Sequence, residues 1–251
     1  MGSKSPHTTI ALVTGANQGI GFEIAKKLGT EHPDYHVLVA GRRKDAIDEA
    51  VTKLQDLKVS CEPLLLDVTS DDSIAAAVKV VQDKHGRLDV LINNAGISRR
   101  LPDQPLATDR ASWNAVFDTN VASVALVTDA FIPLLEKSQV TKRIVNITSG
   151  LGSVDTLQDK ANPFHKHPYT VYGISKAGLN LLTMFYAVKY EDDKTWKFNL
   201  SCPGLCKTNL NDYIEYGEDP TVGAINAVRL ATLGEDGESG TFSNRAGAHA
   251  F

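Results

Sequence analysis

Tyr172 and Lys176 are four residues apart in the segment Tyr172-Gly173-Ile174-Ser175-Lys176. On a helix, positions i and i+4 share one face, so this phenol and this ammonium can act on one point in space. A neighbouring cation favours the phenolate and lowers the pKa of a tyrosine. Bringing that pKa from about 10 to neutrality takes on the order of 4 kcal/mol of preferential phenolate stabilisation. The pair therefore predicts a tyrosine that exchanges a proton with a carbonyl or alcohol oxygen.

The same spacing occurs a second time, between Tyr190 and Lys194. This second pair encloses the acidic run Glu191 to Asp193, a pattern typical of a solvated helix end. For an isolated pair of this kind, a surface role without chemistry is the more common interpretation. What distinguishes Tyr172 from Tyr190 must come from the elements that position each residue.

Composition limits the classes of function. The 251 residues are 42% apolar, enough for a sizeable core, and the net charge of −4 gives no reason to expect nucleic acid or an anionic membrane surface as a partner. We see no apolar stretch that spans a bilayer, and Met1 to Thr9 lacks the apolar core of a signal peptide. Three cysteines without metal-like spacing indicate reduced thiols, so we expect a cytoplasmic protein.

Short apolar runs alternate with segments of helical periodicity. The expected strands are Ile10–Thr14, His36–Ala40, Cys61–Leu66, Val90–Ile92, Arg143–Ile147, Phe198–Cys202 and a short one near Thr241. The expected helices are Ile20–Leu28, Lys44–Leu57, Ser73–Lys84, Ser112–Leu135, Tyr169–Tyr190 and Pro220–Leu233. This alternation predicts a single α/β domain over residues 1–251, a doubly wound, Rossmann-type parallel sheet of about seven strands with helices on both faces. Ligands of such sheets bind beyond the carboxyl ends of the strands.

A glycine-rich turn follows the first strand. Its spacing is Gly-x-x-x-Gly-x-Gly, from Gly15 through Gly19 to Gly21, and a helical segment comes next. Glycines there let the backbone approach a pyrophosphate, and the helix amino terminus supplies amides and positive dipole. A turn chosen only for tight packing is the alternative. The predicted cofactor contacts from this turn are Gly15, Asn17, Gln18, Gly19, Ile20 and Gly21.

The second strand ends in Ala40-Gly41-Arg42-Arg43-Lys44. An acidic residue near this point would bind a ribose 2′-hydroxyl, whereas an arginine accommodates a 2′-phosphate. Cations at a helix amino terminus oppose the helix dipole, so a simple surface run of charge explains them less well. Arg42 therefore favours NADP(H) over NAD(H).

The third and fourth strands end in polar residues at the same edge of the sheet. Asp67 and Val68 follow the third strand, and the carboxylate can either accept from an adenine amino group or belong to a helix N-cap. Asn94, Ala95 and Gly96 follow the fourth, where an ordinary turn is the alternative. We expect all five residues to contact the cofactor.

Taken in order, these residues resemble the short-chain dehydrogenase/reductase family. The resemblance covers residues 10 to about 208 and rests on Gly15, Gly19, Gly21, Asp67, the Asn93-Asn94-Ala95-Gly96 turn, Asn120, Ser149, Tyr172, Lys176 and Pro203-Gly204. It implies NAD(P)(H) as cofactor, interconversion of alcohols and carbonyls, and the strand order 3-2-1-4-5-6-7.

The resemblance also implies a role for each catalytic residue. Ser149 would hydrogen-bond the substrate oxygen, and Tyr172 would be the general acid in reduction and the base in oxidation. Lys176 would hold the nicotinamide ribose and depress the tyrosine pKa, while Asn120 would position a water that links Lys176 to solvent. The expected nicotinamide contacts after the sixth strand are Pro203, Gly204 and Thr208.

Two features depart from the common family pattern. Ser149 and Tyr172 are 23 residues apart (172 − 149), against roughly a dozen in many members, so residues 151–168 form an insertion. Leu151, Leu157 and Phe164 are candidates for apolar contact with a substrate. The short carboxyl-terminal sequence is more like the carbonyl-reductase-like, NADPH-preferring branch. A mobile substrate lid is expected at about 205–220.

The expected function is the reversible, NADPH-dependent reduction of a ketone or aldehyde on a small organic substrate. An isomerase, dehydratase or epimerase that uses the same site is an alternative, as is a non-catalytic NADP(H)-sensing protein. His165 and His167 lack convergent ligands, so we expect no metal site. The resemblance favours a homo-oligomer, a dimer or tetramer, through the two long helices Ser112–Leu135 and Tyr169–Tyr190; a monomer is the alternative.

Overall fold

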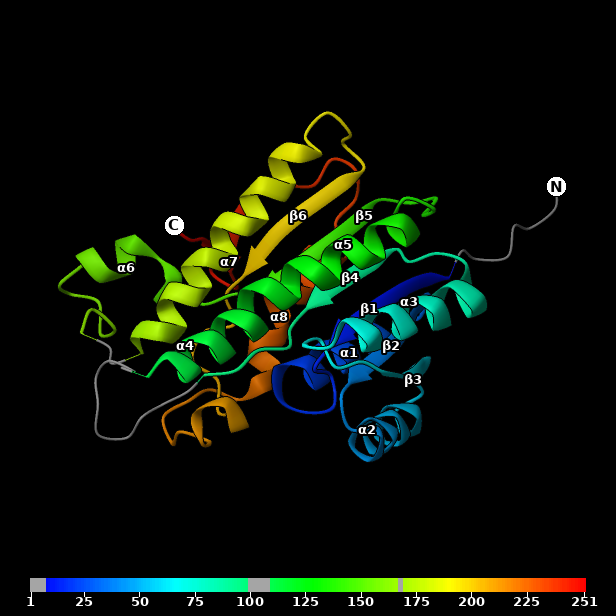
Figure 1. Cartoon of the computed structure of the whole chain (residues 1–251), viewed down its shortest axis with the longest axis horizontal. Coiled ribbons are helices and arrows are strands. Elements are labelled where there is room, and N and C mark those ends of the chain that lie inside the picture. The colour runs from blue at the N-terminus through cyan, green and yellow to red at the C-terminus, as the bar shows by residue number, and fades with distance from the viewer. Residues whose placement is uncertain (1–7, 99–108, 167–168) are drawn as a thin grey trace.

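The computed structural model describes residues 8–98, 109–166 and 169–251. One sheet contains eight strands in the order β3-β2-β1-β4-β5-β6-β7-β8 (Figure 1). The strands are β1 Thr9–Thr14, β2 Tyr35–Gly41, β3 Cys61–Leu65, β4 Val90–Asn93, β5 Lys142–Ile147, β6 Trp196–Ser201, β7 Thr241–Asn244 and β8 Gly247–Ala248. Strands β1 to β7 are parallel and follow the expected order, which confirms the doubly wound α/β fold. The additional strand, β8, is antiparallel to β7; its two exposed residues carry no apolar pattern that could have predicted it.

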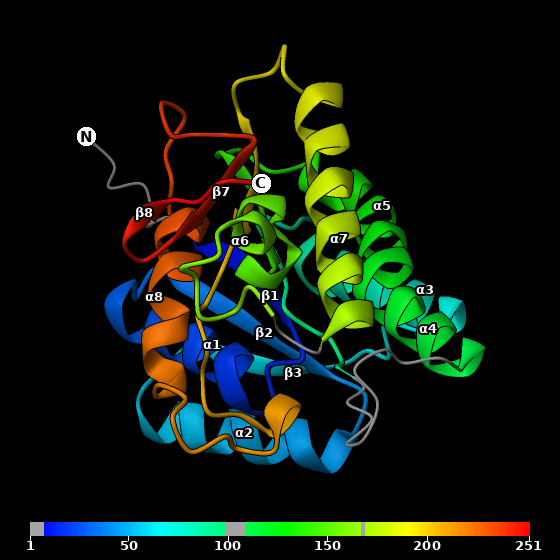
Figure 2. The same cartoon turned by 90° about the vertical axis from the view of Figure 1, so that its left-hand side faces the viewer.

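Helices cover both faces of the sheet, as Figures 1 and 2 show. Buried apolar residues of α1, α2 and α8 form one core layer, and those of α3, α5 and α7 form the other. The helices are α1 Gly19–Glu31, α2 Lys44–Asp56, α3 Asp71–His85, α4 Arg110–Phe117, α5 Ser123–Leu135, α6 Val154–Gln158, α7 Thr170–Lys189 and α8 Pro220–Ala231. Short turns of 3₁₀ helix lie at η2 Gly150–Gly152 and η3 Asn209–Asn211. Because the strands are covered on both sides, they read in sequence as continuous apolar runs.

The predicted helix Ser112–Leu135 is three pieces. Between α4 and α5 the chain makes a π-helical turn, η1 Asp118–Ala122, which widens the helix. The apolar periodicity continues through this turn, so the hydrophobic pattern of the sequence could not predict it. Single π turns occur frequently at functional sites, and this one contains Asn120.

The same helical run corrects the expectation that no apolar stretch is long enough to span a bilayer. Among the described residues, Arg110–Leu135 is the one helix long and apolar enough to cross a bilayer, with 26 residues and a mean hydropathy of 1.4. Val127, Phe131 and Leu135 on α5 are buried in the core layer against the sheet. Core packing therefore accounts for the apolar character of this helix.

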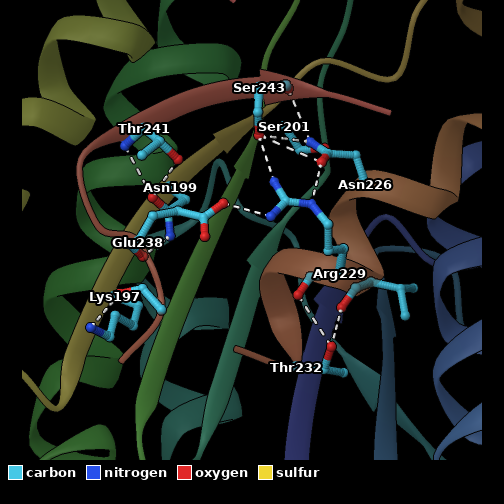
Figure 3. A network of polar contacts seen from close by, with 11 residues as sticks. Lys197, Asn199, Ser201, Asn226, Arg229, Thr232, Glu238, Thr241 and Ser243 are labelled. Carbon is cyan, nitrogen blue, oxygen red and sulfur yellow. Dashed lines mark hydrogen bonds and ion pairs between the residues drawn. The ribbon is translucent and has the colours of Figure 1, made fainter. Parts of the chain in front are cut away.

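A polar network ties the last helix to the last parallel strands (Figure 3). The Asn226 amide on α8 donates to the Ser201 hydroxyl on β6 and to the Ser243 carbonyl on β7, both at 3.0 Å. Arg229 donates to Asn226 at 3.0 Å and to Glu238 at 2.5 Å. This network fixes β7, and the chain that follows β7 returns toward the site described next.

Candidate active site

A cavity of about 1480 Å³ opens beyond the carboxyl ends of the strands. The predicted site residues that line it are Gly15, Asn17, Gln18, Gly19, Ile20, Arg42, Asp67, Val68, Asn94, Ala95, Gly96, Ser149, Tyr172, Lys176, Pro203, Gly204 and Thr208. The two other predicted residues, Gly21 and Asn120, are buried. The structure therefore gathers at one sheet edge residues spread over nearly two hundred positions of the sequence.

The glycine-rich turn requires its glycines. Gly15 and Gly19 have φ of 63° and 57°, a region that favours residues without a Cβ. A Cβ on Gly21 would lie 2.4 Å from the Asn94 side-chain nitrogen and 2.5 Å from the Gly15 carbonyl oxygen. Gln18, the N-cap of α1, makes no side-chain capping bond within the described chain. Gly19 and Ile20, the first residues of α1, line the cavity, so the helix amino terminus lies where a pyrophosphate would suit it.

Asn94 positions this turn. Its amide donates to the carbonyl oxygens of Thr14 and Gly15, at 2.9 and 3.2 Å. The Thr14 hydroxyl in turn accepts from the backbone amides of Asn94 and Ala95, both at 3.0 Å. Thr14 was missed from sequence because a threonine at the end of a strand has no distinctive spacing. The side chain of Asn94, predicted as a direct cofactor contact, is engaged with the protein backbone.

Arg42 is exposed and lines the cavity where β2 ends. Lys44, the third cation of the run, forms an ion pair with Asp48 at 2.5 Å, one turn along α2. Asp67 lies at the same edge, and its Oδ1 accepts from the Thr69 amide and hydroxyl at 3.1 and 2.8 Å. The N-cap of α3 is Ser70, so Asp67 lies in the N-cap region, as its alternative interpretation expects, without being the capping residue itself.

Ser149, Tyr172 and Lys176, which the sequence predicts to be catalytic, lie together at the cavity wall. Lys176, only 4% exposed, donates to the Ile147 carbonyl at 2.8 Å, and its ammonium lies 5.6 Å from the centroid of the Tyr172 ring. The Ser149 hydroxyl is hydrogen-bonded to Tyr172. The three groups that the sequence assigned to proton transfer therefore lie together at the end of β5.

Asn120 closes the back of this group. Its side chain accepts from the Ile97 amide and donates to the Ile97 carbonyl, both at 2.9 Å. It also donates to the Ser175 hydroxyl at 3.0 Å, and that hydroxyl donates to the Tyr172 carbonyl at 2.7 Å. The side chain of Asn120 thus connects the π turn to the loop after β4 and to the first turns of α7.

Burial dominates the proton affinities of the pair. Desolvation raises the pKa of Tyr172 above its ordinary value, and the hydrogen bond from Ser149 only partly opposes that rise. Desolvation also lowers the pKa of Lys176 to about 8. The expected lowering of the tyrosine pKa is therefore wrong for the protein alone, because desolvation by burial outweighs the hydrogen bond from Ser149. At neutral pH the phenol is protonated and the amine is mostly ammonium.

The second Tyr-x-x-x-Lys pair has a different setting. Tyr190 is the C-cap of α7, as expected of a helix end. Its ring packs 4.5 Å from the Trp196 ring and 5.4 Å from the Phe198 ring, so it is half-buried rather than solvated. Tyr190 therefore serves the packing of α7 on β6.

Two thiols lie in the cavity wall. Cys202, which the sequence did not single out, accepts a hydrogen bond from the Gly150 amide at 3.2 Å. Burial raises its pKa, and burial likewise raises the pKa of Cys206 to about 11. Neither cysteine is thus an activated thiolate.

The insertion and the carboxyl terminus line the outer part of the cavity. Leu151 and Phe164 do so as expected, whereas Leu157 is 46% exposed and its carbonyl accepts from His165 at 2.7 Å. His167 lies outside the described residues. Lining residues that the sequence did not predict are Thr156, Asn162, Tyr169, Asn244 and His249.

His249 reaches the cavity from the far end of the chain. Its ring stacks on Phe242 with centroids 4.5 Å apart, and a Cβ on Gly150 would lie 3.1 Å from its Nε2. The carbonyl of Phe251 accepts from the Asp155 amide at the start of α6. No spacing signal could have joined residues 249 and 150.

The predicted lid is a loop closed at its base. The Lys207 amide donates a hydrogen bond to the Glu218 carbonyl at 2.7 Å, and the Glu218 amide donates to the Leu205 carbonyl at 2.8 Å. Arg245 holds the Glu218 carboxylate with two hydrogen bonds, of 2.8 and 2.7 Å. Tyr213, in the middle of the loop, is 57% exposed and lines the cavity, so it is not an ordinary packing group.

Comparison with known proteins gives consistent matches. The profile of the short chain dehydrogenase family matches residues 9–219. A short-chain dehydrogenase/reductase of Aspergillus fumigatus is 40% identical over 232 residues, which cover 88% of this chain and 87% of that protein. Among solved structures, an actinorhodin polyketide ketoreductase with NADPH aligns with a TM-score of 0.79 at 26% identity, over 97% of both chains. The menthone neomenthol reductase of Mentha piperita aligns with a TM-score of 0.74 at 27% identity, over 95% of this chain and 99% of its own.

Proposed function

The chain belongs to the short-chain dehydrogenase/reductase family, and we propose that it reduces a ketone or aldehyde to an alcohol with NADPH. Membership of this family supports an oxidoreductase that acts on carbonyl or CH–OH groups. The observation that supports carbonyl reduction is the group Ser149, Tyr172 and Lys176 at the wall of one cavity, with the Tyr172 phenol hydrogen-bonded to Ser149. A protonated tyrosine is what reduction requires of a general acid.

The residues fit a dinucleotide. The glycine turn leaves no room for a Cβ at Gly21, and the first residues of α1 line the cavity. Arg42 supports a 2′-phosphate at the end of β2. Lys176 would hold the ribose of the nicotinamide half, and Pro203, Gly204 and Thr208 would contact its ring. The sequence expectation of NADP(H) is thus our proposal for the cofactor.

Each protein group then has one task. NADPH, when bound, supplies the hydride for the carbonyl carbon. Ser149 donates a hydrogen bond to the carbonyl oxygen, and Tyr172 gives that oxygen its proton as negative charge develops there. The Lys176 ammonium favours the phenolate that this transfer leaves behind. Asn120, held in the π turn, would position the water that returns a proton toward Lys176.

Replacement of Tyr172 tests this assignment. In Tyr172→Phe, turnover of a reducible ketone should fall by at least about 100-fold, because the general acid is lost. The affinity for NADPH, measured by fluorescence titration, should remain within a few-fold. Tyr190→Phe is the matched control from the second pair and should keep full turnover. Unchanged turnover in Tyr172→Phe contradicts the proposal.

The consumption of NADPH distinguishes carbonyl reduction from the other reactions that this site could catalyse. Isomerisation, dehydration or epimerisation would leave NADPH absorbance unchanged over the whole reaction, whereas reduction consumes one NADPH per product. A nucleotide sensor has no need for Asn120, Ser149, Tyr172 and Lys176 together, which favours an enzyme. No observation on the site favours one of these alternatives.

The surroundings of the site complete the proposal. Residues 151–168 and about 205–220 would enclose a small organic substrate and set its specificity. A homo-oligomer, a dimer or tetramer, is favoured by the exposed apolar side chains of α7, of which Leu181 is 61% and Phe185 is 68% exposed. The family is generally soluble, and a cytoplasmic location agrees with the three free cysteines.

A further inference from the structure

Three side chains with metal-ligating atoms meet at the edge of the sheet opposite the cavity. His36 is the second residue of β2, Glu62 is the second residue of β3, and His85 is the last residue of α3. One donor atom from each lies within 4.8 Å of the donor atoms of the other two. All three side chains are partly buried. The cluster is thus built by three elements.

His36 has a nitrogen whose position calls for a ligand. Its Nδ1 lies 2.8 Å from the Ser60 hydroxyl. Its Nε2 is buried and has no hydrogen-bond partner among the residues that the structure describes. In the tautomer that carries its proton on Nδ1, the ring donates to the Ser60 hydroxyl and Nε2 has a free lone pair. A hydrogen bond to the far ring nitrogen is the usual way in which proteins orient a metal-binding histidine.

The other two residues already touch. His85 Nε2 lies 3.0 Å from Glu62 Oε1, and Lys84 Nζ lies 3.2 Å from Glu62 Oε2. An ordinary surface ion pair explains those two contacts, but it leaves the buried nitrogen of His36 unexplained. A cation between the three groups gives the buried His36 nitrogen a partner and accounts for the convergence of His36, Glu62 and His85. The rings of His36 and His85, with centroids 5.5 Å apart, bracket its position.

We propose that His36 Nε2, Glu62 Oε1 and His85 Nε2 bind one Zn²⁺ ion. Two imidazoles and one carboxylate suit Zn²⁺, whereas Ca²⁺ and Mg²⁺ prefer shells made of oxygen. A tetrahedral ion with bonds of about 2.1 Å needs donor atoms roughly 3.4 Å apart, which small side-chain rotations provide here. Water completes the fourth position. The ion joins β2, β3 and α3 and takes no part in hydride transfer.

Lys84 makes the proposal more specific. Its side chain is 52% exposed, and its ammonium lies beside one of the proposed ligands. A cation there competes with Zn²⁺ for the charge of Glu62. Lys84→Gln should therefore bind Zn²⁺ more tightly than the unaltered protein, whereas a simple Glu62–His85 ion pair predicts no such gain.

Calorimetric titration of the chelator-treated full chain with ZnCl₂ tests the site. We expect one ion per chain and a higher Tm with Zn²⁺ than without. His36→Gln and Glu62→Gln should each weaken this binding at least about tenfold, since even the loss of an outer-shell partner costs that much. His32→Gln is the matched control, because His32 packs on Tyr35 outside the cluster and should leave Zn²⁺ binding unchanged.

Cobalt provides a second readout. Co²⁺ at the proposed site should give the visible absorption of a four-coordinate ion, and His36→Gln should abolish it. The metal-free Tm of each variant reports whether it still folds; should His36→Gln fail to fold, His85→Gln replaces it in both measurements. No Zn²⁺ binding, or equal binding in the unaltered protein, His36→Gln and Glu62→Gln, overturns the proposal. Carbonyl reduction by Glu62→Gln should be unchanged, so this test stands apart from that of the active site.

Discussion

At the scale of the residue, Lys176 controls whether the site is charged. The structure surrounds its ammonium with protein and gives it the Ile147 carbonyl as a hydrogen-bond partner at 2.8 Å. Burial lowers its pKa to about 8, so the charge disappears within a pH range that is easily measured. The phenol of Tyr172, whose pKa is raised, stays protonated over the same range.

We expect kcat/KM for NADPH to fall as the pH rises through about 8, because this ratio reports the groups of the free enzyme. The sign follows from the chemistry: the ammonium that would hold the ribose is present below pH 8 and is lost above it. Lys176→Arg keeps its charge and should have no break near pH 8, although its activity is lower. A break that persists in Lys176→Arg assigns the titration to another group.

Arg42 decides between the two nicotinamide cofactors. In Arg42→Ala, the affinity for NADP⁺ should fall roughly tenfold or more, since a hydrogen bond to a charged group contributes about 1.5–3 kcal/mol. The affinity for NAD⁺, which lacks the 2′-phosphate, should change little. Lys44→Ala is the matched control, because Lys44 pairs with Asp48. Equal losses for both dinucleotides in Arg42→Ala contradict the 2′-phosphate assignment.

Residue types and their order were enough to predict which side chains meet at the cavity, but not the direction of their pKa shifts. The Tyr-x-x-x-Lys spacing is the same at residue 172 and at residue 190. The first pair faces the cavity, whereas Tyr190 packs on Trp196. The sequence predicted a lowered tyrosine pKa from the lysine alone, because desolvation depends on how neighbouring elements close around the pair.

At the scale of the element, the π turn η1 holds the back of the site. The side chain of Asn120 makes three hydrogen bonds, to both backbone groups of Ile97 and to Ser175. The bond to Ser175 is buried and the two bonds to Ile97 are partly buried, so the loss of these partners destabilises the fold. The turn thereby couples the loop after β4 to the helix that carries Tyr172.

Asn120→Ala should lower the free energy of unfolding by about 1–3 kcal/mol, since it leaves the partly buried backbone groups of Ile97 and the buried Ser175 hydroxyl without this partner. It should also reduce turnover, because Ser175 and the start of α7 lose an anchor. Urea denaturation and steady-state kinetics measure the two effects. Asn114→Ala, at an exposed position of α4, is the matched control and should alter neither. Full stability of Asn120→Ala would show that the π turn does not depend on this side chain.

Elements with a repeating pattern were predictable, and elements fixed by tertiary contacts were not. Buried strands such as β1 and β5 were found because continuous apolar runs are typical of covered parallel strands. The π turn interrupts no periodicity, and β8 has two residues. The path of the chain after β7, which brings His249 to the cavity, depends on the network around Asn226.

At the scale of the whole molecule, one helix face is unusually apolar for a surface. Exposed on α7 are Ile174, Leu181, Phe185 and Val188, with exposed fractions from 45% to 68%, and Leu126 on α5 is 48% exposed. Surface patches of this kind mark association sites. A symmetric contact with a second copy would cover them.

We expect the protein to be a homo-oligomer in solution, and the double variant Leu181→Glu/Phe185→Glu to be a monomer, because charges on this face cannot be buried without partners. Size-exclusion chromatography with light scattering measures both states. Leu57→Glu, at an exposed position after α2, is the matched control and should keep the assembly. A monomeric unaltered protein refutes this arrangement.

The edge strands on the two sides of the sheet affect whether copies of this chain can associate by strand addition. On one side β8 pairs with β7, so the longer strand is not left as a template for another chain. On the other side the outermost strand is β3, which contains Pro63, a residue without a backbone N–H. Aggregation by strand addition is thus discouraged at both edges, so ordered assembly is left to the helices.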